Sequence, residues 1–184
     1  PGDDTTVAAV RVIDKKMVKI FTGPPINQED DERMVQEFIQ TDGGSVVCGG
    51  TSANIVSRVL GKPLEVSLEY FSADVPPMAT LEGIDLVTEG IVTLNRVLQL
   101  FKQYNEGELS RDFFDQLDQK DGGARLAKLL IENCTDLKLF VGRTINAAYQ
   151  NPMIPFDFNL RVALIEQLKE AIEKAGKTVS ISYM

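Results

Sequence analysis

The chain has 184 residues, 43% of them hydrophobic, so it can bury a sizeable core as one domain or as a domain with an appendage. Its net charge of -8 argues against a nucleic-acid partner, because neutralising phosphates requires clustered Lys and Arg. The absence of histidine excludes Ser-His-Asp and Cys-His catalysis and histidine-based zinc sites.

The sequence also indicates a cellular compartment. No apolar stretch approaches the roughly 18 residues of a spanning helix, and the first residues do not resemble a signal peptide. Cys48 and Cys134 lack metal-ligand spacing, and we interpret both as buried, reduced thiols. We therefore expect a cytoplasmic protein with no membrane partner. Because the chain begins at Pro1 rather than Met, we also expect a piece of a longer protein.

Two β-type runs, 5–13 and 17–22, open the chain, and we predict that they pair as an N-terminal β-hairpin. Residues 23–25, Gly-Pro-Pro, then break the pattern. The expected domains are a hairpin arm over 1–25 and an α/β domain over 26–184.

Strands and helices are predicted to alternate through the rest of the chain. Periodicity predicts helices at about 28–40, 51–60, 91–104, 122–133 and 158–175, and strands at 45–48, 64–70, 84–87, 137–141 and 178–183. The acidic run 28–32 suits the first turn of a helix better than a metal site. Residues 105–121 are either a short helix over an opening or an excursion. This alternation predicts an α/β fold, a mainly parallel sheet with helices on both faces.

Polar turns follow the three most apolar strands, and the carboxyl ends of parallel strands meet at one edge, where ligands bind in such sheets. We therefore expect the turns to line a crevice for a small polar or anionic molecule. The candidate ligand-binding residues are Gly49, Gly50, Thr51, Ser52, Asn54, Asp85, Thr88, Glu89, Arg143 and Asn146.

The turn Gly49-Gly50-Thr51-Ser52 has two interpretations. Its glycines and the following helix N-terminus can cradle an anion, or the glycines only turn the chain and Thr51 or Ser52 caps the helix. The turn lacks the lysine of a P-loop and the third glycine of a dinucleotide fingerprint.

The other turns are equally open to structural explanations. Thr88 and Glu89 can begin a helix instead of binding a ligand, and Asp121 can be a plain N-cap. Asp85, within an apolar strand, needs a partner. Arg143 can pair with Asp85, with Glu89 or with an anionic ligand.

Residues 3–12, DDTTVAAVRV, resemble the closing motif of the stage II sporulation protein E branch of metal-dependent, type 2C phosphatases. The resemblance implies a metal-ligating role for Asp3, completion of the motif by Asp4 and Thr6, and residues 7–22 as the last hairpin of a catalytic sandwich. The remainder of the chain resembles the extension that follows the catalytic domain in some bacterial members.

The resemblance implies a serine/threonine phosphatase that uses Mn²⁺ or Mg²⁺. This chain lacks the other metal-binding strands, so we expect it to be catalytically incomplete, with no cofactor of its own. Our leading hypothesis is a regulatory, ligand-binding domain that contacts the catalytic domain in cis. The alternative is a structural or dimerisation module without ligand, and a homodimer is a further expectation. An independent enzyme using Asp85, Glu89 and Arg143 is the weakest hypothesis.

Overall fold

The computed structural model describes residues 6–8, 10, 12, 14–66, 79–107, 109–143 and 157–184. The strands are β1 (Met17–Thr22), β2 (Gly44–Cys48), β3 (Leu64–Val66), β4 (Ala79–Leu81), β5 (Ile84–Thr88), β6 (Asp136–Val141) and β7 (Thr178–Tyr183). The helices are η1 (Gln28–Asp30), α1 (Asp31–Gln40), α2 (Gly50–Leu60), α3 (Ile91–Glu106), α4 (Arg111–Leu117), α5 (Gly122–Asn133) and α6 (Asp157–Lys174).

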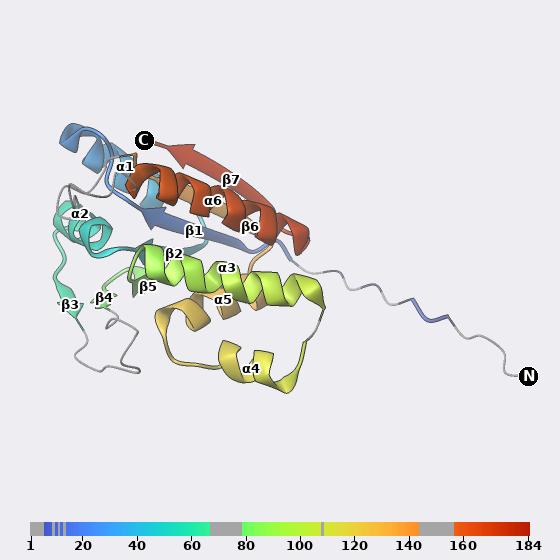
Figure 1. Cartoon of the computed structure of the whole chain (residues 1–184). Coiled ribbons are helices and arrows are strands. Elements are labelled where there is room, and N and C mark those ends of the chain that lie inside the picture. The colour runs from blue at the N-terminus through green and yellow to red at the C-terminus, as the bar shows by residue number, and fades with distance from the viewer. Residues whose placement is uncertain are drawn as a thin grey trace, which may run out of the picture.

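The strands form one sheet in the order β3-β4-β5-β2-β1-β6-β7 (Figure 1). Strands β5, β2, β1, β6 and β7 run parallel, whereas β4 is antiparallel to β5 and β3 to β4. Helices α3, α5 and α6 pack on one face, and α1 and α2 pack on the other. The predicted α/β fold with a mainly parallel, doubly covered sheet is confirmed.

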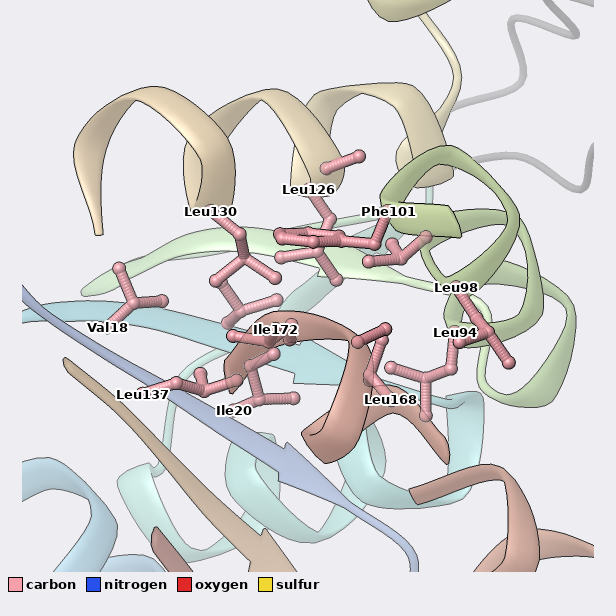
Figure 2. Close-up of a cluster of buried hydrophobic side chains, with 14 of the residues drawn as sticks. Val18, Ile20, Leu94, Leu98, Phe101, Leu126, Leu130, Leu137, Leu168 and Ile172 are labelled. Atoms are coloured by element: carbon pink, nitrogen blue, oxygen red, sulfur yellow. The ribbon is translucent and has the colours of Figure 1, made fainter. Parts of the chain in front are cut away.

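The larger core lies between the sheet and α3, α5 and α6. Figure 2 shows Phe101, Leu126 and Leu130 gathered with Ile20 and Leu137 of the central strands. All five side chains are buried, and a buried aliphatic or aromatic side chain contributes about 1.5–3 kcal/mol relative to an exposed one. This packing fixes α3 and α5 against the sheet.

The predicted N-terminal hairpin is wrong. Strand β1 pairs in parallel with β2 on one side and with β6 on the other, so neither edge is open to residues 5–13. Of the residues before β1, those that the structure describes belong to no strand. The α/β unit therefore begins at Met17, not at residue 26, and β1 is the middle one of its five described parallel strands.

Most of the other predicted elements are confirmed within a few residues. The predicted strand 64–70 is described only as β3, because residues 67–78 lie outside the described part of the chain. Strand β4 was not predicted from the sequence. The irregular segment 105–121 contains α4, which packs against α3 and α5 and does not line the cavity described below. Among the described helices, none has the length and apolar content to cross a membrane.

The strand order reverses between β1 and β6. From β1 the chain winds to β2 and β5 on one side, then crosses to β6 and β7 on the other. Crevices for ligands form outside the carboxyl ends of strands near such a reversal. The turns after β1, β2, β5 and β6 are therefore the places where a ligand site is expected.

Candidate functional site

A cavity of about 430 Å³ lies at this carboxyl edge. Its lining consists of residues 22–24, 48–52 and 89–92 together with Arg161. These residues come from the ends of β1, β2 and β5, the first turns of α2 and α3, and α6. The cavity therefore combines three neighbouring strand ends with two helix N-termini.

The turn after β2 requires glycine at its first position. Gly49 has φ 112° and ψ 136°, a conformation that residues with a side chain rarely adopt. Its N–H donates to the Thr88 carbonyl at 2.8 Å, which ties this turn to the end of β5. A Cβ on Gly90 would lie 3.5 Å from the Gly49 Cα, so the two turns pass close together.

The two helices that open at the cavity have no side-chain cap. Gly49 precedes α2 and Gly90 precedes α3, whereas α4 and α5 are capped by the side chains of Ser110 and Asp121. The first intrahelical bond of α2 starts at Ala53 N–H, so the preceding amides of its first turn have no intrahelical acceptor. The amides of a first helical turn and the helix dipole create a partial positive charge at each N-terminus. Both positive ends lie at the same cavity.

Ser52 has a structural role in this arrangement. It is buried, and its Oγ accepts a hydrogen bond from the Gly23 N–H at 2.8 Å. This bond links the start of α2 to the turn after β1. Thr51 is exposed and lines the cavity.

Among the described residues that line the cavity, Arg161 is the cationic one, and it was not among the residues predicted from the sequence. It is 9% exposed, and a Cβ on Gly23 would lie only 2.7 Å from its Nη1, so the guanidinium packs over that glycine. A signal was available, because Arg161 precedes the buried Leu164 and Ile165 by three and four residues on one face of α6. An arginine on such a buried stripe is a candidate ligand contact or structural ion-pair partner.

Glu89 brings an acceptor to the same wall. It is half-buried and lines the cavity beside the start of α3. Thr88, by contrast, is buried, with its hydroxyl 2.9 Å from the Glu89 carbonyl and 3.4 Å from Cys48 Sγ, and it does not line the cavity. Burial raises the pKa of the Cys48 thiol to about 12, against the opposing effect of the Thr88 hydroxyl, so this thiol stays protonated.

The structure brings Gly49, Gly50, Thr51, Ser52 and Glu89 together as predicted. It also confirms that Asp121 caps α5, since its Oδ1 accepts from the N–H groups of the second and third helical residues. The two cysteines are free and buried, as expected.

Other predicted site residues lie elsewhere. Asp85 is at the amino end of β5, where its Oδ2 accepts from the Ser45 N–H at 2.7 Å and the Ser45 hydroxyl at 3.1 Å. Arg143 follows β6 at the carboxyl edge, but it is exposed and does not line the cavity. Of the three partners considered for Arg143, Asp85 is therefore excluded, and the enzyme site made of Asp85, Glu89 and Arg143 is wrong. Asn54 is exposed on α2, away from the lining.

Asn146 and Asp3 lie outside the residues that the structure describes. Within the described ranges, no group of three or more His, Cys, Asp or Glu residues is placed to hold a metal ion. Comparisons with protein-family models, with curated proteins and with solved structures find no match to this chain.

Proposed function

We propose that this α/β domain binds a small anionic molecule in the cavity at the carboxyl edge of its sheet. One observation carries the proposal. The N-termini of α2 and α3, each preceded by a glycine, and the Arg161 guanidinium all lie at one cavity. Backbone N–H groups at a helix N-terminus are suited to bind phosphate or carboxylate oxygens. A guanidinium adds two parallel donors for the same groups.

The volume of the cavity and the Glu89 carboxylate in its lining limit the class of ligand that fits. A volume of about 430 Å³ is within the range of sites for small metabolites. Glu89 disfavours a ligand that is anionic throughout and favours one that also carries a hydroxyl or amino donor. Phosphorylated sugars and nucleotides combine these two properties.

A thermal-shift experiment tests the proposal. Inorganic phosphate, nucleotides and phosphorylated sugars are each added to the full chain, with chloride at matched ionic strength as control. A ligand at 100 times its Kd should stabilise the fold by about 2.7 kcal/mol. The Arg161→Gln variant should lose much of this shift, whereas Arg143→Gln, at the same edge but outside the lining, should keep it. A flat response to every anion contradicts the proposal.

We also propose that the domain regulates a catalytic domain of the stage II sporulation protein E type, a cytoplasmic Mn²⁺- or Mg²⁺-dependent phosphatase attached in cis. The motif at Asp3, Asp4 and Thr6 supports it. The exposure of Val7, Val10 and Val12, which are 84%, 93% and 93% exposed, also supports it, because a strand of another sheet would bury such residues. Since β1 belongs to the α/β sheet, residues 5–13 alone would be that strand.

Regulation requires that the ligand prefer one docking of the two domains, because equal affinity for both would shift nothing. The coding sequence upstream of Pro1 tests the attachment. A catalytic segment with Asp-Gly and Gly-rich motifs supports the proposal, and a start codon directly before Pro1 contradicts it.

A further inference from the structure

The two edges of the sheet differ in how they are protected. Strand β3 spans three of the residues that the structure describes, carries Glu65 and directly follows Lys62 and Pro63. Strand β7 has six residues, Thr-Val-Ser-Ile-Ser-Tyr, with no charge and no proline, and pairs with β6 without a register shift. Natural sheets protect edges with short strands, charges, prolines or bulges, because an open edge is a template for another strand. Strand β7 has none of these protections.

The hydrogen bonds to β6 show which backbone groups of β7 face outward. The Thr178 N–H donates to the Thr135 carbonyl at 2.9 Å, and the Met184 N–H donates to the Val141 carbonyl at 3.0 Å. Because backbone groups alternate in direction along a strand, the even-numbered residues pair with β6. The N–H and C=O groups of Val179, Ile181 and Tyr183 therefore face the open edge, which no strand in the described part of the chain covers.

The nearest side-chain charge before the strand is turned away from this edge. The Lys177 ammonium donates to the Cys134 carbonyl at 2.7 Å and to the Ile131 carbonyl at 3.0 Å, at the end of α5. At the other end, the Tyr183 hydroxyl donates to Glu166 of α6 at 2.8 Å, and Tyr183 remains 41% exposed. The open edge of β7 thus consists of outward N–H and C=O groups on a strand without charged side chains, beside the aromatic ring of Tyr183.

We propose that β7 pairs with β7 of a second copy of this chain, antiparallel about a two-fold axis through Ile181. Val179 then lies opposite Tyr183 of the second copy, and Ile181 lies opposite Ile181. In this register every outward N–H of one copy meets an outward C=O of the other. Moving the axis to Ser180 or Ser182 leaves outward groups at one end of the strand unmatched.

A second copy fits this edge for electrostatic and packing reasons. The chain carries a net charge of -8, which opposes self-association over most of its surface, whereas β7 brings no like charges face to face. The Val179 and Tyr183 pairs add aromatic contacts to β-branched side chains, each worth about 0.2–1 kcal/mol. The cavity stays open, because β6 separates β7 from β1, β2 and β5. A single strand pair is a small interface, so the dimer should dissociate on dilution.

Sedimentation velocity of the full chain over a concentration series tests the inference, with hydrogen exchange to locate the interface. We expect a monomer–dimer equilibrium in which the amides of Val179, Ile181 and Tyr183 gain protection as concentration rises. A monomer at all concentrations overturns the proposal, and so does a dimer that leaves these amides unprotected.

Two variants at one position separate the backbone contribution from side-chain packing. Ile181→Pro removes an outward N–H that the monomer does not use, so it should abolish the dimer, while Ile181→Ala keeps the N–H and should retain a weaker dimer. If Ile181→Pro does not fold, combined Ser180→Lys and Ser182→Lys changes place ammonium groups opposite one another across the axis. These should also abolish the dimer, and its persistence in a folded variant overturns the proposal.

Discussion

A carboxylate placed at Gly50 should strengthen the fold and abolish anion binding. Gly50 is the first residue of α2, it lines the cavity, and a Cβ built there meets no atom within 4 Å. The change Gly50→Asp is therefore free of steric conflict. A carboxylate in the first helical turn contributes about 0.3–1 kcal/mol, and replacing a glycine in a compatible conformation contributes about 0.4–1 kcal/mol. Together these should raise the Tm by roughly 2–6 °C.

The same carboxylate should oppose the ligand. Two like charges about 4 Å apart repel by about 4 kcal/mol at an effective dielectric constant of 20. The affinity for phosphate should therefore fall by roughly two to three orders of magnitude. Gly50→Ala is the matched control, because it supplies the Cβ without the charge and should keep most of the binding.

Calorimetric titration with phosphate and thermal unfolding of the three proteins check both expectations. If Gly50→Asp is as stable as the parent or more so and still binds phosphate with parental affinity, the cavity is not the anion site. If Gly50→Ala loses binding to the same extent as Gly50→Asp, the electrostatic explanation is wrong.

Three further predictions concern the framework around the cavity. In Gly142→Ala the added Cβ would lie 2.1 Å from the Pro24 carbonyl oxygen. Urea unfolding should therefore show a loss of stability of about 3 kcal/mol or more. A loss below about 1 kcal/mol would contradict this close packing. Asp121→Ala should cost about 1–2 kcal/mol by removing the cap of α5, and Asp121→Asn should cost less. Because the pKa of Cys48 is raised from 9.0 to about 12, the protonated thiol contributes stability that is fully present below pH 9 and lost as pH rises toward 12. Cys48→Ala should flatten this alkaline decline in the unfolding free energy, and an unchanged slope would show that other groups cause it.

The sequence predicted the carboxyl edge well, because three apolar strands each end in a polar turn. The end of β2 and the start of α2 could be assigned from Gly49 and Gly50 alone, since glycines there both end the strand and admit a positive φ. Glu89 was found by the same reasoning. These signals depend only on residues that are neighbours in the sequence, so they hold whatever the order of the strands in the sheet.

The misplaced residues depended on information that is not local. Lys19 makes 17–22 look like a strand with one solvated face, but in the fold its ammonium donates to the Ile39 carbonyl and lies 5.2 Å from the centre of the Phe38 ring. Strand β1 could therefore be central despite its charge. Asp85 is the second residue of β5, and strand direction places it at the amino edge. Arg161 reaches the cavity only because α6 packs across the sheet, which no motif near the glycine turns could reveal.

Amide NMR spectra recorded during a titration with inorganic phosphate would show whether an anion binds at this edge of the sheet. We expect the amide signals of the first helical turns at the cavity to shift together and saturate. These are the signals of Gly50, Thr51 and Ser52 in α2 and of Ile91 and Val92 in α3. Signals on β7 should not shift. Saturating shifts confined to another part of the protein, or none at these five amides, would contradict an anion site at this edge.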